Sequence, residues 1–436
     1  MTSLIQPTRI LIVGGGGREH ALAWKLGTEP GVNEVAVAPG SDAIAREARV
    51  RVARDVDPLD PEAIVKLARE RAAELVVIGP EAPLPAGVAD ALIDAGIPVF
   101  GPTAAAARIE SSKAFCREVA EVAGVPLAEG RSFGPGETAA AHAYASELGR
   151  RHGVVVKEDG LAAGKGVTVC DRAAVAAAAI DAIDGPLVIE ERLVGPEASV
   201  IAICDGRTAL ALPAARDHKR LGDGDSGPNT GGMGAYSPLP DLSDEAVADI
   251  VERFHRPILA ELARRGAPFR GALYAGLMLT SDGPRLLEFN ARFGDPETQV
   301  IVPRLATALA PLLLAAARGR LDPTRLIPVV PGAIVGIVLA SAGYPGAAES
   351  GARITALDAA GRLPDAPDVL VFHSGTLREV GPVFLANGGR VLTVVGRGRD
   401  LAAARAVAEV AVDRIAWPGA QRRHDIAAAS AIGVPA

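Results

Sequence analysis

The segment EFNARFGDPE, residues 288–297, concentrates charged and amide side chains in a short stretch. The apolar residues before it predict a strand. On a strand, Glu288, Asn290 and Arg292 point the same way, because side chains two residues apart share a face. A carboxylate and an amide oxygen are hard ligands of the kind that Mg²⁺ takes together with nucleotide phosphates, and an arginine can fork onto phosphate oxygens. We therefore predict a metal and phosphate site here rather than a solvent-exposed loop.

Two further carboxylates, Asp295 and Glu297, follow within the same segment. They can be metal ligands, N-terminal caps of a helix or ion-pair partners of Arg292. The sequence leaves these three alternatives open, because each requires a different neighbour in space.

A second candidate site is the glycine-rich segment DGLAAGKGV, residues 159–167. A P-loop needs four residues between its first glycine and the Gly-Lys pair, then a serine or threonine for Mg²⁺. Here only three residues intervene and Gly166 follows Lys165. Strands are predicted on both sides, so the segment is a hairpin tip whose amides can close over phosphates as a lid. Lys157, at the end of the preceding strand, favours this interpretation over a plain flexible hairpin.

The segment VGGGGREHA, residues 13–21, joins a predicted strand to a predicted helix. Backbone N–H groups at a helix N-terminus suit an anion. The dinucleotide fingerprint would place a third glycine where Glu19 stands. With Arg18 and His20 beside it, the helix start suits a small polar ligand better than a flat dinucleotide. The alternative is a tight turn with no ligand.

Two other polar stretches carry weaker signals. VIEERLVGPEAS, residues 188–199, has Glu190, Glu191 and Glu197 after an apolar strand, which suits either a purine and ribose contact or an ordinary exposed strand end. RDHKRLGDGDSGPNTGGMGAY, residues 216–236, has little periodicity and is predicted to be a long loop, which is usually functional or disordered. Its lysine and arginines favour contact with an anionic substrate, and His218 is either a base or a simple donor.

The elements that must position these residues divide the chain into three regions. Residues 1–104 alternate strand and helix, which predicts a Rossmann-like parallel sheet covered by helices. Residues 105–330 contain a capped helix and consecutive strands joined by glycine-rich turns, which predicts an α+β region. RLIPVVPG, residues 325–332, is a predicted linker. Residues 331–436 are predicted to form a small C-terminal α/β domain. The fold class is therefore multidomain α/β and α+β.

Composition excludes several classes of protein. The chain has 436 residues, of which 49% are hydrophobic and 22% charged, and this mixture is typical of a folded globular protein. The net charge of −7 argues against binding nucleic acid through bulk positive charge. Cys116, Cys170 and Cys204 form no close pair, so they are predicted to be buried apolar residues in a reducing compartment. No membrane span or leader is predicted, and a cytoplasmic monomer is expected.

Taken together and in this order, the motifs resemble those of the phosphoribosylamine–glycine ligase family. The resemblance covers nearly the whole chain and includes GGGGREHALAWKL, IGPEAPL, SKAF, DGLAAGKGV, DHKRLGDGDSGPNTGGMGAYSP, EFNARFGDPETQ, GYPG and NGGRVL. It implies an ATP-grasp fold, in which two α+β lobes clasp the nucleotide, with a small mobile lobe at about 125–193. It also implies ATP-dependent joining of glycine to 5-phosphoribosylamine through a glycyl phosphate, in purine biosynthesis.

The resemblance assigns roles to individual positions. Glu288 and Asn290 would hold Mg²⁺ or Mn²⁺. Arg292, with Lys219 and Asp217 near the substrates, would be catalytic. The implied ATP-binding residues are Lys113, Lys157, Gly160, Leu161, Ala162, Ala163, Gly164, Lys165, Gly166, Glu190, Glu191, Leu193 and Glu197. The implied substrate-binding residues are Gly15, Gly16, Gly17, Arg18, Glu81 and Asn229.

The sequence departs from the family pattern at a few positions. Glu158 follows Lys157 where relatives usually have a small residue; pointing into the ATP cleft it would weaken nucleotide binding, and pointing outward it would be harmless. Ala291 replaces a cysteine of many relatives, which should matter little. Ala427 replaces the glycine that usually ends an Asp-Ile-Gly motif, which concerns C-terminal packing. The predicted strand YAGLML, residues 274–279, offers no second metal carboxylate.

Three other functions compete with this interpretation. A different ATP-grasp ligase would keep 157–166 and 288–292 but change RDHKR and GGGGREH. A non-catalytic nucleotide sensor would usually lose Glu288, Asn290 or Arg292, all of which are present. A dinucleotide oxidoreductase is suggested only by the glycines at 14–17, and Glu19 argues against it.

Overall fold

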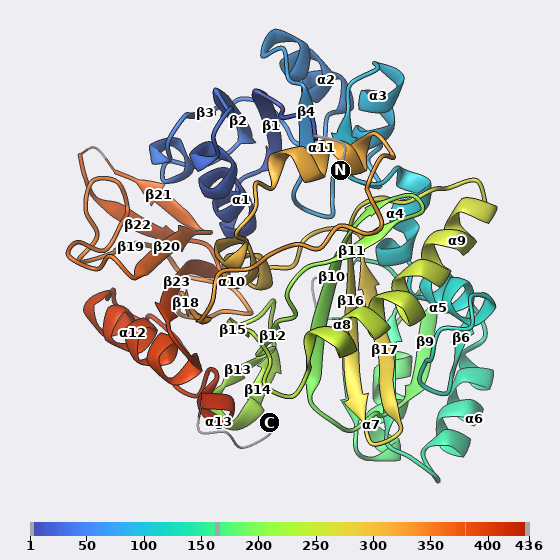
Figure 1. The fold of residues 1–436 in the computed structure, drawn as a ribbon. Coiled ribbons are helices and arrows are strands. Elements are labelled where there is room, and N and C mark those ends of the chain that lie inside the picture. Colours follow the sequence, from blue (N-terminus) through green and yellow to red (C-terminus); the bar gives the residue numbers. More distant parts are fainter. Residues whose placement is uncertain (1–3, 162–165, 380, 432–436) are drawn as a thin grey trace.

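The structure is a computed structural model that describes residues 4–161, 166–379 and 381–431. Figure 1 shows an N-terminal parallel sheet at the top, antiparallel sheets at the right and a C-terminal sheet at the left. None of the helices within these ranges is long and apolar enough to cross a membrane. Cys116, Cys170 and Cys204 are buried and unpaired, as the sequence predicts.

The N-terminal sheet consists of five strands, all parallel, in the order β3-β2-β1-β4-β5. Its strands are β1 (Arg9–Gly14), β2 (Glu34–Pro39), β3 (Val50–Val52), β4 (Leu75–Ile78) and β5 (Val99–Phe100). Its helices are α1 (Gly17–Thr28), α2 (Pro61–Glu70) and α3 (Val88–Asp94). The chain leaves β1 toward one edge and returns at β4 toward the other. The loops after β1 and β4 therefore meet at the switch point, where ligands of open α/β sheets bind.

A four-stranded antiparallel sheet with the order β6-β9-β7-β8 forms a separate small lobe. Its elements are β6 (Gly130–Phe133), α6 (Thr138–Leu148), β7 (Val154–Glu158), β8 (Val167–Cys170), α7 (Ala173–Asp181) and β9 (Leu187–Glu191). Its hydrophobic core is its own, because the buried cluster that runs from Phe133 to Ile189 takes no residue from outside that stretch. We refer to residues 130–191 as the small lobe.

The facing lobe is built on a second antiparallel sheet, β11-β10-β16-β17. Its strands are β10 (Glu197–Asp205), β11 (Ala209–Ala211), β16 (Arg270–Thr280) and β17 (Gly283–Asn290). The associated helices are α4 (Ala104–Ser111), α5 (Lys113–Val122), α8 (Asp244–Ile250), a π-helical turn (Val251–His255) and α9 (Arg256–Arg264). Of Ser111 and Ser112, the two caps that the sequence predicts for this helix, Ser112 is the one that caps α5, and its Oγ accepts from the Phe115 N–H at 3.1 Å.

The C-terminal sheet differs from the prediction in one respect. It has the order β12-β15-β18-β23-β20, and β12 and β15 come from the stretch 216–237, which the sequence predicts to be loop. Short, glycine-rich strands carry no apolar alternation, so their partners alone define them. The strands of this region are β12 (Arg216–Asp217), β13 (Arg220–Gly222), β14 (Ser226–Asn229), β15 (Gly234–Ser237), β18 (Ala333–Ala340), β20 (Val369–His373) and β23 (Arg390–Gly398).

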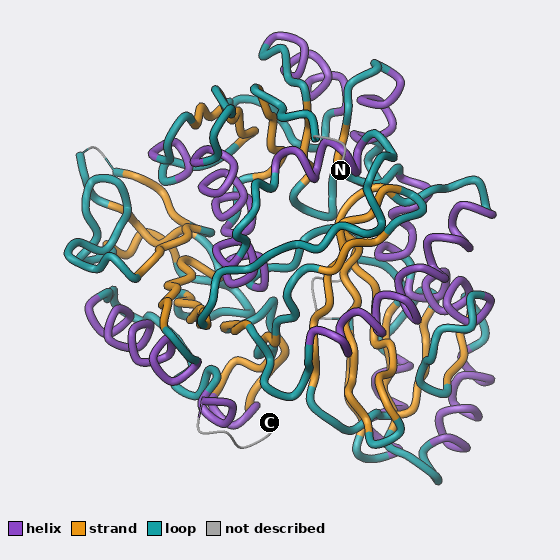
Figure 2. Tube along the Cα trace, viewed as in Figure 1, coloured by secondary structure: helices purple, strands orange, loops and turns teal. Residues whose placement is uncertain are grey.

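The remaining elements complete the C-terminal region. β13 and β14 form a separate hairpin. β19 (Ser350–Arg353), β22 (Phe384–Asn387) and β21 (Thr376–Arg378) form a three-stranded sheet, and α12 (Leu401–Arg414) and α13 (Ala428–Ala431) follow. α10 (Glu297–Ile301) and α11 (Ala310–Ala317) precede this region. Figure 2 shows the segment between α11 and β18, which contains the predicted linker, as a long loop.

Candidate functional site

Strand β17 carries the two predicted metal ligands on one face. Glu288 and Asn290 both lie within the strand, and the Asn290 side-chain Nδ2 donates to Glu288 Oε1 at 3.4 Å. The Glu288 side chain is 40% exposed, so its carboxylate is accessible from solvent. Arg292 lies two residues beyond the strand end. Glu288 and Asn290 therefore share one face of β17, as the period of a strand predicts.

Three lysines from three separate segments of the chain lie near this strand: Lys113 on α5, Lys157 on β7 and Lys219 between β12 and β13. Lys219 Nζ is 3.0 Å from Glu197 Oε2 and 3.9 Å from Glu288 Oε1. Lys157, on β7 of the small lobe, donates to the Leu287 carbonyl oxygen at 3.0 Å. Lys113, the first residue of α5, donates from Nζ to the Gly160 carbonyl oxygen at 2.8 Å.

The charges in this cluster shift each other's pKa values. Burial would raise the pKa of Glu288, but Lys219 and Lys157 outweigh it and hold that pKa below its usual range. Burial would lower the pKa of Lys219, but Glu197 and Asp217 hold it well above the ordinary value. Burial raises the pKa of the Asp217 carboxyl, and Lys219 offsets only part of that effect. Glu288 is therefore anionic, and Lys219 cationic, at neutral pH.

The donor set fits a divalent cation that is bound together with phosphates. Within the described ranges, no group of three or more His, Cys, Asp or Glu side chains is placed to hold a metal by itself. Mg²⁺ usually takes one or two protein ligands plus substrate phosphates and waters. Glu288 and Asn290 supply two such ligands, and the surrounding lysines supply charge for the phosphates.

The glycine-rich loop joins β7 to β8, as predicted. The Glu158 N–H donates to the Gly166 carbonyl oxygen at 2.8 Å, which closes the hairpin. Leu161 is 45% exposed at the start of the loop. Ala162, Ala163, Gly164 and Lys165 lie outside the described residues. Lys157 is buried whereas Glu158, at the end of the strand, is exposed. Burial lowers the pKa of Lys113, and the charge of Glu158 offsets part of that effect.

Asp159 attaches the start of this loop to the facing lobe. Its carboxylate accepts from Ser112 Oγ at 3.0 Å, from the Ala114 N–H at 3.2 Å and from the Lys113 N–H. It therefore caps α5 from the opposite lobe, where a negative charge also favours the helix dipole. Asp159 is not among the site residues predicted from the sequence, although its position beside the glycine loop is a usable signal.

The glutamates predicted to lie near adenosine are largely engaged within the protein. Glu190 is buried, with Oε1 3.1 Å from Arg117 Nη1 and Oε2 2.6 Å from Lys157 Nζ. Glu191 accepts from the Glu129 N–H at 2.8 Å. Leu193 is half-buried just after β9. Glu190 thus acts on the site through Lys157, whose charge it balances.

Arg292 is held between two carboxylates. Its Nη2 is 3.1 Å from Glu110 Oε1, and its Nε is 3.3 Å from Glu81 Oε2. Glu110 also accepts from the Ala291 N–H at 2.8 Å, so both of its oxygens hold the segment that follows β17. The sequence analysis missed Glu110, because its partners lie about 180 residues away and no local pattern marks it.

Asp295 and Glu297 do not pair with Arg292. Asp295 lies 3.2 Å from Arg390 Nη2 and accepts from Gln299 Nε2 at 2.7 Å. Glu297 is buried and accepts from Ser199 Oγ at 3.0 Å. Of the three alternatives for these residues, partnership with Arg292 is excluded by their contacts.

The loop after β1 is packed against residues from several other parts of the chain. Its Gly16 N–H donates to Glu19 Oε2 at 2.7 Å, so one amide of the predicted anion site is already occupied. Arg18 is buried and donates to Glu19 and to the Phe293 carbonyl oxygen. A Cβ on Gly17 would lie 2.5 Å from Ser374 Oγ and 2.8 Å from Gln299 Nε2, so these side chains would have to move. Gly15 is more firmly confined, since a Cβ would lie 2.8 Å from the backbone oxygen of Gly40.

The remaining predicted residues lie toward the C-terminal sheet. Asn229 lines a cavity of about 360 Å³ with Thr230, Gly231, Tyr344, Pro345, Gly346, Ala348, Gly389 and Arg390. His218 turns to the C-terminal segment, where its Nε2 accepts from the Ala427 N–H at 3.4 Å. Burial, assisted by Arg423, lowers the pKa of His218 to about 4, so it is neutral near pH 7.

The chain matches three consecutive domains of one family. Residues 8–110 match the phosphoribosylglycinamide synthetase N domain, residues 111–298 its ATP-grasp (A) domain and residues 334–429 its C domain. A phosphoribosylamine–glycine ligase of Streptomyces coelicolor is 50% identical over 97% of this chain and 99% of the relative. Its counterpart in Rhodopirellula baltica is 46% identical over 96% of both chains.

Solved structures agree with these matches. A phosphoribosylamine–glycine ligase from Thermotoga maritima superposes with a TM-score of 0.78 and 33% identity, covering 96% of this chain and all of that one. The biotin carboxylase domain of a Hydrogenobacter thermophilus 2-oxoglutarate carboxylase superposes with a TM-score of 0.70 at 18% identity, covering 96% of this chain and 92% of that one. The second likeness concerns the fold alone. The predicted fold class, an N-terminal parallel sheet followed by an ATP-grasp region and a C-terminal domain, is confirmed.

Proposed function

Because the chain belongs to the phosphoribosylglycinamide synthetase family, also called phosphoribosylamine–glycine ligases, we propose that it joins glycine to 5-phosphoribosylamine in an ATP-dependent reaction. The products are glycinamide ribonucleotide, ADP and phosphate, and the reaction belongs to purine biosynthesis. One observation carries this proposal beyond family membership. Lys113, Lys157 and Lys219 come from separate segments of the chain and surround one accessible carboxylate, Glu288.

The reaction divides into two steps. In the first, the γ-phosphoryl group moves from ATP to a carboxylate oxygen of glycine, which releases ADP and leaves glycyl phosphate. In the second, the ribosyl amine attacks the carbonyl carbon, the C–N bond forms, the C–O bond to phosphate breaks, and the amine loses a proton. Neither step needs a protein nucleophile, so the contribution of the chain is orientation and charge.

The described side chains fit the first step. Lys113 and Lys157 lie on opposite lobes and supply positive charge where the phosphates of ATP would lie. Arg292 is fixed by Glu81 and Glu110, and we assign it to the charge of the transferred phosphoryl group. We assign to the small lobe, which carries Lys157, the exclusion of water from the acyl phosphate.

We assign the metal to Glu288 and Asn290, as either Mg²⁺ or Mn²⁺. A divalent cation there would neutralise phosphate charge and orient the phosphoryl group. The Glu288→Gln variant tests the assignment, because it keeps the size of the side chain and removes the charge. We expect turnover to fall at least 100-fold at saturating Mg²⁺, with an unchanged denaturation temperature. Glu118→Gln, which changes an exposed glutamate on α5, is the control. Near-normal turnover of Glu288→Gln would rule the assignment out.

The second step involves residues from three regions. Asp217 and Lys219 are assigned to the substrates beside Glu288, because Lys219 already bridges Glu197 and Glu288. The loop Gly15–Arg18 and Glu81, which meet at the switch point of the parallel sheet, are assigned to 5-phosphoribosylamine. Asn229 is assigned to the same substrate from the side of the C-terminal sheet, where it lines a cavity.

Phosphate release from ATP with Mg²⁺, glycine and 5-phosphoribosylamine generated in situ tests the proposal, with each component omitted in turn. We expect release that requires both glycine and the amine. Release with neither would indicate another ATPase, and release that requires a different amine or acid would indicate another ATP-grasp ligase. Tight ATP binding without release under any mixture would indicate a nucleotide sensor.

We also propose the three-part division 1–104, 105–330 and 331–436 with a mobile lobe at about 125–193. The separate hydrophobic core of the small lobe supports its motion as a unit. The pairing of β15 with β18 ties the middle region to the last one, so these two regions should unfold together. A monomer acting in the cytoplasm is proposed as well, and light scattering on the purified protein tests the monomer.

A further inference from the structure

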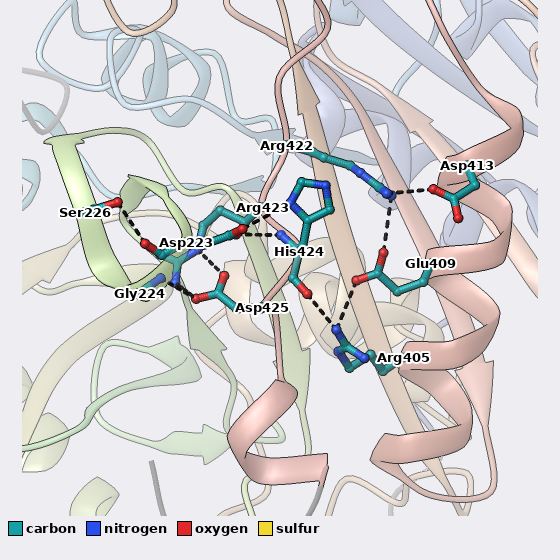
Figure 3. A network of polar contacts seen from close by, with 10 residues as sticks. All are labelled: Asp223, Gly224, Ser226, Arg405, Glu409, Asp413, Arg422, Arg423, His424 and Asp425. Carbon is teal, nitrogen blue, oxygen red and sulfur yellow. Dashed lines mark hydrogen bonds and ion pairs between the residues drawn. The ribbon is translucent and has the colours of Figure 1, made fainter.

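The C-terminal segment, residues 422–427, lies against the β13–β14 hairpin that follows Lys219 (Figure 3). Arg423 is the centre of this contact and is only 1% exposed. Its Nη1 lies 2.6 Å from Asp225 Oδ1 and donates to the Arg220 carbonyl oxygen at 3.2 Å. Its Nε and Nη2 lie 2.7 and 2.6 Å from the two oxygens of Asp425. A single guanidinium thus joins both segments.

The turn of the hairpin is held by the same segment. The His424 N–H donates to Asp223 Oδ1 at 2.7 Å, and its ring Nδ1 lies 3.1 Å from Asp223 Oδ2. Asp425 accepts from the Gly224 N–H at 2.8 Å. The turn has few contacts of its own with a core, since Asp223, Gly224 and Asp225 are all exposed. Its conformation therefore depends on the C-terminal segment.

Both sequence neighbours of Lys219 receive hydrogen bonds from this segment. On one side, the Ala427 N–H donates to His218 Nε2; on the other, Arg423 donates to the carbonyl oxygen of Arg220. The carbonyl oxygen of Lys219 itself is held by the N–H and Oγ1 of Thr230, each at 2.8 Å. Arg423 thus holds the backbone directly after Lys219, and the C-terminal segment reaches the residue before it through the His218 ring. The Nζ of Lys219 itself reaches Glu197 and Glu288.

We propose that Arg423 is a positioning residue that sets the place of the Lys219 ammonium in the reaction. The inference rests on the proposed function, in which Lys219 contacts the substrates. Arginine suits this role because its planar fork binds several acceptors at once, which a lysine cannot do. Small displacements of a charged group from its productive place lower the rate of a reaction that depends on orientation.

The adjacent Arg422 provides a matched control. It pairs with Glu409 at 3.2 Å and Asp413 at 2.6 Å, both on α12, and makes no contact with the hairpin among the described interactions. Figure 3 shows the two arginines directed to opposite sides of the segment. Replacing Arg422 removes a charge and a packed side chain from the same segment but leaves the hairpin contacts in place.

The experiment measures kcat and the KM values for ATP and glycine in Arg423→Lys, Arg423→Gln, Asp225→Asn and Arg422→Gln. We expect the Arg423 variants to lower kcat by about 10- to 100-fold, with the KM for ATP within about two-fold of the parent. Asp225→Asn, which removes an exposed partner of Arg423, should lower kcat by a smaller factor and keeps the proposal testable if the Arg423 variants do not fold. Arg422→Gln should match the parent.

A double-mutant cycle separates positioning from stability. In a Lys219→Met background, Arg423→Lys and Asp225→Asn should have almost no further effect on kcat, because they act through the missing ammonium. The proposal is overturned if Arg423→Lys and Asp225→Asn lower kcat by the same factor with and without Lys219. It is also overturned if Arg422→Gln lowers kcat as much as the Arg423 variants do. If Lys219→Met alone leaves turnover unchanged, it is the proposed role of Lys219 that fails.

Discussion

At the scale of single residues, Ala427 shows how one departure from the family pattern is accommodated. Its φ is +58°, in the left-handed region where a Cβ is unfavourable and glycine is not. The sequence places alanine where the family motif usually has glycine. The residue nevertheless keeps its contact with His218, so the backbone conformation is preserved despite the side chain.

We expect Ala427→Gly to increase the free energy of unfolding by about 0.5 kcal/mol. The relief of left-handed backbone strain should exceed the combined cost of the lost methyl contacts and of the greater entropy of the unfolded chain. Thermal denaturation measures the change. Ala406→Gly, at an exposed position inside α12, is the opposite control and should cost about 1 kcal/mol. A loss of stability at position 427 would mean that burial of the methyl group outweighs the strain.

At the scale of elements, the small lobe contacts α5 through a capping carboxylate, in addition to the pair of Arg117 with Glu190 and the bond from Lys113 to Gly160. Asp159 accepts from Ser112, Lys113 and Ala114 at the first turn of this helix, and it immediately precedes the glycine loop. The N-terminus of α5 therefore helps to hold the loop over the site.

Asp159→Ala should release the start of the loop and raise the KM for ATP by about 10-fold, with a smaller change in kcat, because a cap of this kind contributes about 1–2 kcal/mol. Initial rates at varied ATP concentration give both constants. Asp181→Asn, an exposed partner of His142 in the same lobe, serves as the comparison and should leave the KM unchanged. An unaltered KM in Asp159→Ala would show that the loop is positioned without this cap.

At the scale of the whole molecule, two histidines are buried without charge. His255 Nε2 donates to the Val200 and Leu273 carbonyl oxygens, and burial lowers the pKa of His255 to about 4. Burial, with the nearby His20, lowers the pKa of His373 to about 3. Both side chains are fully buried in the fold.

The unfolded chain binds protons at these histidines below pH about 6.5, whereas the folded chain does not until pH 3–4. Stability should therefore be complete above pH 6.5 and fall as the pH decreases, by up to about 1.4 kcal/mol per pH unit for each histidine. Denaturation temperatures at pH 7.5, 6.5 and 5.5 test this. His373→Gln should lose less stability over that interval than the parent, whereas His142→Gln, at a partly exposed site, should not differ from it. Parallel curves for the parent and His373→Gln would contradict the prediction.

The sequence by itself determined most of the elements and placed Glu288 and Asn290 on one face of β17, although it predicted the strands β12 and β15 as loop. Apolar runs, helix caps and glycine turns are local signals, and two residues on one strand share a face wherever the strand lies. Glu288, Asn290, Lys157 and the hairpin loop could be selected in this way. Only the tertiary structure decided which charges meet. Glu110 with Arg292, and Arg423 with Asp225, are joined across about 180 and 200 residues of chain. Such pairs form only when helices and strands pack against each other, and the sequence around each partner has no periodicity that indicates the other.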